Sequence, residues 1–182
     1  MLNKEFIRKK YLKKRKKNFF KINNKFFNPL IKLLKKKKLK KTNIALYYPS
    51  SDELDILQIL KLNFFKKKKF LLPIIEDNNK MNFCKWETND ILFVNKFGIL
   101  EPSKTKPIVP NIMLIPMLAF DENKNRLGYG KGFYDKFLRK CAQNGKKIIT
   151  VGVAFSFQKY HNLPTDDKDV KLNFIITEKG LV

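Results

Sequence analysis

The chain has 182 residues, of which 43% are hydrophobic and 13% aromatic, a composition that excludes an intrinsically disordered protein and suffices for one sizeable core. No apolar run approaches the roughly 20 residues of a membrane-spanning helix, and the lysine-rich start lacks the continuous apolar core of a secretion signal. We therefore expect one cytoplasmic domain over residues 1–182, without membrane association.

The formal net charge of +24 is typical of proteins that bind nucleic acid or other polyanions. Its distribution argues against specific nucleic-acid recognition, because the basic residues are mostly lysine runs such as 35–38 and 66–69. Arginine, which makes bidentate contacts to bases and phosphates, occurs only four times. An AT-rich genome would explain the joint excess of lysine, asparagine, phenylalanine and isoleucine. A basic nucleic-acid-binding protein remains the alternative.

Two helices are expected at the start of the chain. Residues 3–17 carry Phe6, Ile7 and Leu12 among lysines, a weakly amphipathic pattern. Asn28 as N-cap and Pro29 at the first position predict a second helix to about Lys38. A packed helix pair and two membrane-surface helices both fit this pattern, and we favour the packed pair.

The next segment predicts a buried strand followed by a helix. Ile44 to Tyr48 is a short apolar run that ends at Pro49. Ser50 and Glu53 have the spacing of a capping box for a helix to about Leu62, so Glu53 could be a helix cap.

Further strands alternate with helical segments along the rest of the chain, which indicates an α/β fold with a mixed, mostly parallel sheet. Cys84 and Cys141 lack the spacing of a metal site and are expected to be reduced thiols. The expected strands are 69–75 and 81–86 around an Asp77-Asn78-Asn79 turn, then 91–94, 112–115, 147–155 and 174–177.

A glycine-rich basic loop precedes an expected helix over 133–139. Gly128, Gly130 and Gly132 alternate around Lys131, so that backbone N–H groups can converge on an anion beside a lysine and Arg126. The loop fits neither the phosphate-binding Walker A pattern nor the dinucleotide-binding glycine pattern. A tight turn before a helix is the alternative interpretation. Asp121 and Asp135 bracket the loop, and one of them could be a magnesium ligand. Asp121 could instead be a turn residue.

The motif Arg-Leu-Gly-x-Gly-x-Gly-aromatic-Tyr-Asp over 126–135, preceded by Pro-x-x-Ala-Phe-Asp over 116–121, resembles the 5-formyltetrahydrofolate cyclo-ligase family. The resemblance extends over most of the chain. It includes Lys4 and Arg8, the segments 47–53, 72–73 and 98–102 with Met81, and 152–155, Gln158, 163–164, Asp169 and 176–178. Lys168 and Asn173 depart from the family pattern, where histidine and aspartate are usual.

The resemblance implies a three-layer α/β/α fold similar to phosphosugar isomerases and CoA transferases. It also implies cyclisation of 5-formyltetrahydrofolate to 5,10-methenyltetrahydrofolate with ATP and magnesium, by a monomer whose substrate carries a polyglutamate tail or none. A sugar-phosphate isomerase or CoA transferase, which would need no ATP, is the other alternative.

The resemblance and the loop chemistry together give the expected site residues. Arg126 and Lys131 are the expected catalytic residues, and Asp135 and Asp169 the expected magnesium ligands. ATP is expected to contact Lys4, Arg8, Arg126, Leu127, Gly128, Tyr129, Gly130, Lys131, Gly132, Phe133 and Tyr134. The folate is expected to contact Tyr48, Glu53, Tyr129, Gly130, Lys131, Gly132 and Phe133, so that Glu53 has a helix-cap and a folate interpretation of similar weight.

Overall fold

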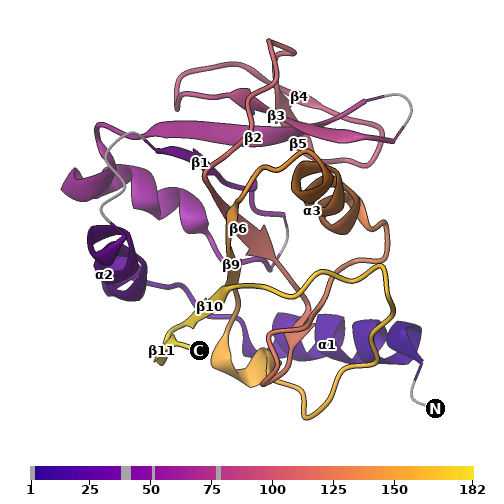
Figure 1. Cartoon of the computed structure of the whole chain (residues 1–182). Coiled ribbons are helices and arrows are strands. Elements are labelled where there is room, and N and C mark those ends of the chain that lie inside the picture. The colour runs from indigo at the N-terminus through magenta and orange to yellow at the C-terminus, as the bar shows by residue number, and fades with distance from the viewer. Residues whose placement is uncertain (1–2, 38–41, 51, 77–78) are drawn as a thin grey trace.

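A mixed seven-stranded sheet organises the computed structural model, which describes residues 3–37, 42–50, 52–76 and 79–182 (Figure 1). The strand order is β11-β10-β9-β6-β1-β2-β3, with the inner neighbours parallel and both edge strands antiparallel. The strands are β1 (Asn43–Ala45), β2 (Lys69–Ile75), β3 (Met81–Lys85), β6 (Ile112–Pro116), β9 (Ile149–Val153), β10 (Phe174–Thr177) and β11 (Gly180–Leu181). The predicted α/β fold with a mixed, mostly parallel sheet is confirmed.

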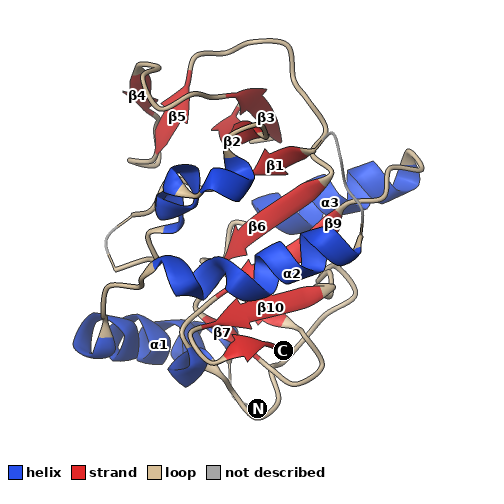
Figure 2. Cartoon of the chain, turned by 90° about the vertical axis from the view of Figure 1, so that its left-hand side faces the viewer, coloured by secondary structure: helices blue, strands red, loops and turns tan. Residues whose placement is uncertain are grey.

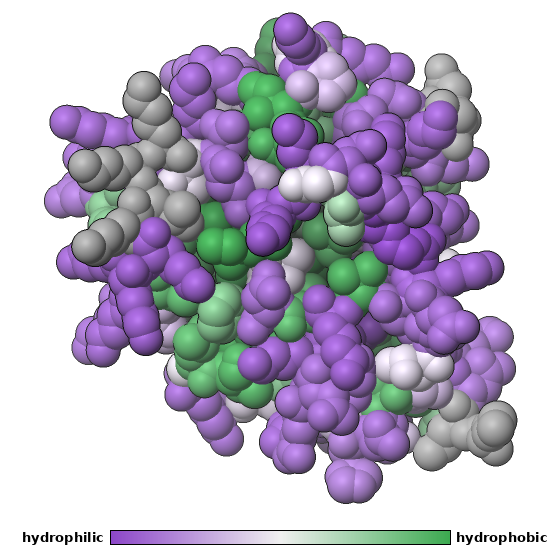
Figure 3. Space-filling view, viewed as in Figure 1, coloured by the Kyte–Doolittle hydropathy of each residue, from purple (hydrophilic) through white to green (hydrophobic). Residues whose placement is uncertain are grey.

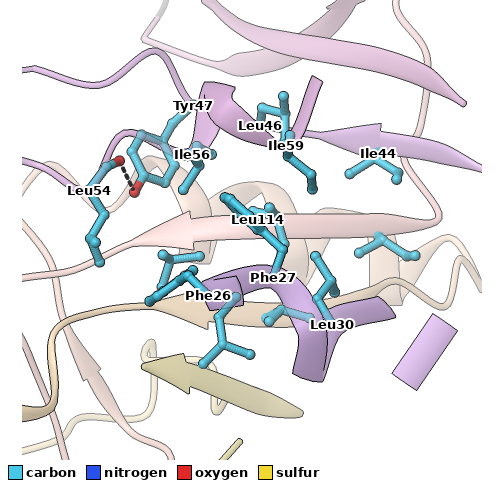
Figure 4. Close-up of a cluster of buried hydrophobic side chains, with 14 of the residues drawn as sticks. Phe26, Phe27, Leu30, Ile44, Leu46, Tyr47, Leu54, Ile56, Ile59 and Leu114 are labelled. Atoms are coloured by element: carbon cyan, nitrogen blue, oxygen red, sulfur yellow. Dashed lines mark hydrogen bonds between the residues drawn. The ribbon is translucent and has the colours of Figure 1, made fainter. Parts of the chain in front are cut away.

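Helices cover both faces of this sheet, because side chains alternate between the faces along each buried strand. Ile112 and Leu114 of β6 pack with Phe27 and other residues around α2 (Asn28–Lys36), as Figure 4 shows in part. Their neighbours Met113 and Ile115 pack on the other face with residues of α3 (Phe133–Gln143). In Figure 2, α2 lies in front of the sheet and α3 behind it. Each large side chain buried in this way stabilises the fold by about 1.5–3 kcal/mol.

The N-terminal helix α1 (Lys4–Asn18) lies beside the C-terminal part of the chain (Figure 1). Ile7 and Tyr11 are buried against the small hairpin of β7 (Ala119–Phe120) and β8 (Arg126–Leu127). Phe6 and Leu12, which the sequence pattern suggested as apolar helix residues, are exposed. Ile7, Tyr11 and Arg15 form the buried stripe instead, since they recur every four residues.

Three short elements differ from the sequence expectation. The helix expected over 50–62 is replaced by two 3-10 helices, η2 (Ile56–Lys61) and η3 (Asn63–Phe65). Asp55, not Ser50, caps η2 by accepting a hydrogen bond from the Leu57 N–H. Asn28 lies inside α2 as its first residue, because the preceding 3-10 helix η1 (Asn24–Phe27) runs directly into it.

Two expected boundaries lie outside the described residues: the end of the second helix at Lys38 and the turn at Asp77 and Asn78. The expected strand 91–94 belongs to a separate hairpin of β4 (Leu92–Val94) and β5 (Leu100–Pro102). The β7–β8 hairpin lies between β6 and the glycine loop. The strand expected over 44–48 is shorter in the structure, where β1 ends at Ala45. The strand expected over 147–155 is likewise limited to β9, Ile149–Val153.

No helix within the described ranges combines the length and apolar character that a bilayer crossing requires. The face of the molecule in Figure 3 carries mainly hydrophilic side chains with smaller hydrophobic patches between them. Cys84 and Cys141 are both buried free thiols, as expected.

Candidate active site

A cavity of about 840 Å³ opens where the parallel strands end. The chain leaves β1 toward β2 on one side and returns through β6 on the other, so the strand order reverses between β1 and β6. Ligands of open α/β sheets bind at the carboxyl ends of the strands beside such a reversal. Tyr47, Ile75 and Pro116, at the ends of the three strand segments, line the cavity.

Every residue expected to bind ATP, folate or magnesium lines this one cavity. The structure therefore brings these residues together around one cavity. The set comprises Lys4, Arg8, Tyr48, Glu53, Asp169 and all of 126–135.

The glycine loop takes a shape that other residues would resist. Gly130 has φ +98° and Gly132 has φ +66°, in the left-handed region that favours glycine. Gly132 is also the residue before α3, so the loop delivers the helix N-terminus and its free N–H groups to the cavity. Arg8 crosses over this loop, donating from Nε to the Gly128 carbonyl at 3.0 Å. The chain thus places a cation and a helix N-terminus on the same loop, an arrangement suited to phosphate.

Ion pairs fix the other cationic groups at this end of the cavity. Lys4 Nζ lies 2.8 Å from Asp166 Oδ2 and 2.6 Å from Asp169 Oδ2. Burial lowers the pKa of Lys4, but its hydrogen bonds and charge interactions with the two aspartates raise that pKa above its usual value overall. Lys4 is therefore a charged group at neutral pH.

Arg126 is nearly enclosed and incompletely hydrogen-bonded. Its Nη2 lies 2.8 Å from Asp135 Oδ2, within ion-pair distance but outside hydrogen-bond geometry. Among the described residues Nε also has no hydrogen-bond partner, and the guanidinium lies over the ring of Tyr134 at 5.6 Å. Burial raises the pKa of Tyr134 well above its usual value. A buried guanidinium with unmet donors is a group that an anionic ligand would satisfy.

The two expected magnesium ligands are both held by positive groups. Asp135 accepts from the Val170 N–H at 3.1 Å as well as pairing with Arg126, and Asp169 pairs with Lys4. In the described part of the chain, no group of three or more His, Cys, Asp or Glu residues is arranged to hold a metal. Magnesium is commonly held by one or two carboxylates together with substrate phosphates and water, so two cavity carboxylates fit that ion only beside a bound polyphosphate.

Glu53, which is buried, and Tyr129, which is 44% exposed, form a polar link across the cavity wall. The Tyr129 hydroxyl donates to Glu53 Oε1 at 2.5 Å, while the Ser50 N–H donates to Glu53 Oε2 at 2.9 Å. The bond from Ser50 is one half of a capping box, but the Glu53 N–H donates to the Ser50 carbonyl and not to its hydroxyl, so the pair closes a turn and starts no α-helix. Arg15, which the sequence analysis did not select, is buried with its guanidinium 5.6 Å from the centre of the Tyr129 ring. Its only sequence signal is the four-residue spacing from Tyr11.

The β4–β5 hairpin supplies an aromatic side chain that contacts the glycine loop. Phe97 lies edge-on to Phe133 with ring centres 5.5 Å apart, and Lys131 Nζ lies 5.6 Å from the centre of the Phe97 ring. Phe97 was also missed by the sequence analysis, because it stands in a short loop with no motif. The cavity therefore has a cationic end near α1 and an apolar, aromatic end near β2, β3 and this hairpin.

The positions of Asp121 and of the two departures from the family pattern, Lys168 and Asn173, show what surrounds each of them. Asp121 is fully buried and accepts from the Asn125 N–H, the Asn125 amide and the Leu163 N–H, so it is the turn residue of the two interpretations. Asn173 joins β9 to β10 by accepting from the Thr150 N–H at 2.9 Å and does not line the cavity, whereas Lys168 does. The Asn173 departure thus falls in the sheet.

The fold and the cavity are those of an α/β enzyme, with backbone N–H donors and cations at one end of the cavity and aromatic side chains at the other. The model of the 5-formyltetrahydrofolate cyclo-ligase family matches residues 2–178, and the chain belongs to that family. Family membership indicates 5-formyltetrahydrofolate cyclo-ligase activity.

Individual relatives agree with this assignment. The 5-formyltetrahydrofolate cyclo-ligase of Haemophilus influenzae is 35% identical over 137 residues, covering 71% of this chain and 72% of that protein. The Mus musculus enzyme of the same name is 38% identical over 147 residues, covering 74% of this chain and 72% of that protein. The structure of the Aquifex aeolicus 5,10-methenyltetrahydrofolate synthetase has a TM-score of 0.76 and 32% identity, covering 100% of this chain and 92% of that one.

Proposed function

We propose that the chain uses ATP and magnesium to close 5-formyltetrahydrofolate to 5,10-methenyltetrahydrofolate, releasing ADP and phosphate. The observation that carries the proposal is that the glycine loop, with Lys4, Arg8 and Arg126 around it, opens into the same cavity as Glu53, Tyr48 and the Phe97–Phe133 pair. That arrangement supports a triphosphate at the cationic end and a reduced pterin at the aromatic end.

The chemistry requires activation of a poor leaving group. The formyl oxygen takes the γ-phosphoryl group of ATP, with cleavage of the bond to the ADP oxygen. N10 of the folate then attacks the activated carbon, the carbon–oxygen bond breaks, and phosphate leaves with the former formyl oxygen, while N10 loses its proton. Such a reaction depends on positioning and charge stabilisation more than on a nucleophile of the protein.

The position of each residue in the cavity determines the part of the reaction that we assign to it. Lys131 and Arg126, with the N–H groups of the glycine loop, stabilise the charge on the transferring phosphoryl group, and Lys4 and Arg8 hold the nucleotide. Asp135 and Asp169 would hold magnesium, which neutralises charge on the phosphate oxygens when bound. Tyr48, Glu53, Tyr129 and Phe133 position the folate, and we add Phe97 to this group because it lines the cavity beside Phe133.

A spectrophotometric assay tests the proposal. Appearance of the methenyl chromophore from 5-formyltetrahydrofolate should require both ATP and magnesium, and one ADP should form per chromophore. A chromophore that forms equally well without ATP, or ADP release without cyclisation, would overturn the assignment. The comparisons give no support to a nucleic-acid-binding protein. A monomer of cytoplasmic location, acting on folate with or without a polyglutamate tail, remains our proposal.

A further inference from the structure

Glu101 of β5 is a buried carboxylate that the proposed mechanism does not use. It is 8% exposed and lines the cavity at its aromatic end. Its Oε1 accepts from the Ile75 N–H at 2.6 Å and from the Asn95 side-chain amide at 2.6 Å. These bonds tie the β4–β5 hairpin to the end of β2.

The second oxygen, Oε2, takes no part in these two bonds. Both hydrogen bonds that Glu101 accepts from described residues fall on Oε1, and neither donor is a cation. A glutamine could satisfy Ile75 and Asn95 through its carbonyl oxygen at lower cost, because burying an unpaired negative charge is unfavourable. The structural role alone therefore does not explain a carboxylate at this position.

Glu53 gives a useful contrast within the same cavity. Both of its oxygens are occupied, Oε1 by Tyr129 and Oε2 by Ser50. Of the two glutamates that line the cavity, Glu101 is thus the one with an acceptor oxygen left for a ligand.

The surroundings of Glu101 define the ligand class. Ile75, Met81, Phe97 and Ile99 line the same cavity, and the Ile75 N–H contacts Glu101 directly, so the cavity offers apolar side chains together with this carboxylate. A flat heterocycle whose edge carries N–H donors matches that combination, because its rings pack on the apolar walls and its donors meet the carboxylate. The aminopyrimidine edge of a reduced pterin has a ring N–H beside an amino group.

We propose that Glu101 is a specificity-determining residue whose Oε2 accepts a charge-assisted hydrogen bond from the aminopyrimidine edge of the pterin. The proposal rests on the proposed function, since it assigns an orientation to the folate named there. With this edge at Glu101, the pterin lies beside the β4–β5 hairpin.

Glu101→Gln isolates the ligand contact from the structural one. The glutamine carbonyl can still accept from Ile75 and Asn95, while Oε2 becomes an NH₂ group that opposes the pterin donors. We expect the Kd for 5-formyltetrahydrofolate, measured calorimetrically without ATP, to rise about 10- to 100-fold, as loss of a hydrogen bond to a charged group implies. The Kd for ATP and the melting temperature should stay unchanged. Glu122→Gln, an exposed carboxylate paired with Lys159 outside the cavity, is the matched control.

A folate analogue without the 2-amino group provides the second arm. Wild-type protein should bind it more weakly than the parent folate, and Glu101→Gln should discriminate between the two much less. Equal folate affinity in wild-type and Glu101→Gln proteins would refute the role of Glu101, as would parallel loss of ATP binding and thermal stability. Failure of the wild-type protein to bind 5-formyltetrahydrofolate at all would instead refute the proposed function.

Discussion

The hydroxyl of Tyr129 donates a 2.5 Å hydrogen bond to Oε1 of Glu53, which stands 76 residues earlier in the chain. This bond connects the glycine loop to the segment that follows β1, so the proposed phosphate-binding and folate-binding parts of the cavity share one contact. A substitution at either residue should therefore affect ligand binding in both parts of the cavity.

Glu53→Gln should raise the folate KM about tenfold. The amide cannot accept from both Tyr129 and Ser50, so it cannot hold both sides of the proposed folate site in place. The melting temperature should stay within a few degrees of the wild-type value. Steady-state kinetics with folate varied at saturating ATP measure the effect. Asp55→Ala is the matched control: it removes the cap of η2, which should cost about 1 kcal/mol of stability without changing KM. Loss of stability in Glu53→Gln with an unaltered KM would identify a purely structural residue.

Lys131→Ala should lower turnover by more than about tenfold, since one lost contact to a transferring charge in an enclosed site is worth about 2–4 kcal/mol. Its folding should be unaffected, because Lys131 is exposed and has no salt bridge among the described residues. Lys140→Ala, an exposed lysine of α3 that does not line the cavity, controls for general loss of positive charge. Wild-type turnover in Lys131→Ala would remove this lysine from the mechanism.

Asp135→Asn should shift the magnesium dependence of turnover to higher concentrations, because a carboxylate is the stronger ligand for a hard cation. The asparagine oxygen can still accept from the Val170 N–H, so the backbone contact is retained. Asp166→Asn changes another cavity carboxylate that pairs with Lys4 and is not an expected metal ligand. If the Asp135→Asn titration matches that of the wild type, the ligand assignment is wrong.

The free energy of unfolding should fall as the pH rises above about 10, the ordinary pKa of tyrosine. Burial raises the pKa of Tyr47 and Tyr134 well above that value in the folded protein, so the unfolded chain loses these protons first. Alkali then favours the unfolded state. Urea midpoints at pH 8 and pH 11 measure the change, and Tyr134→Phe should flatten it. A midpoint independent of pH over this range would show that neither hydroxyl is protected.

The sequence predicted best those parts whose structure is set locally. The bounds of β2 and β10 agree with the expected strands, because each is an apolar run between polar residues. The glycine loop was found for a similar reason: its glycines, cations and following helix lie within ten residues of one another. The expectation that the loop shares a site with Lys4 and Glu53 came from the family resemblance, because only the tertiary structure brings these distant residues together.

The parts that escaped prediction depend on neighbours distant in the chain. The 50–62 segment has the sequence of a capped helix, but Leu54 and Ile56 are buried in the core and force a turn before η2 begins. Arg15 looked like one more surface charge, because nothing local signals the Tyr129 ring that covers it. The role we propose for Glu101 depends on which of its oxygens Asn95 and Ile75 contact, and that is decided by the tertiary structure.

The pairing of Lys4 with Asp166 and Asp169 joins positions 162 and 165 residues apart. A ribosome makes Lys4 early and its two partners late, so this end of the cavity closes only when most of the chain has been synthesised. The β7–β8 hairpin on which α1 packs is made before the 166–169 segment, so the ion pairs of Lys4 form last. Nucleotide should accordingly protect a newly made chain from proteolysis only after the 166–169 segment has emerged.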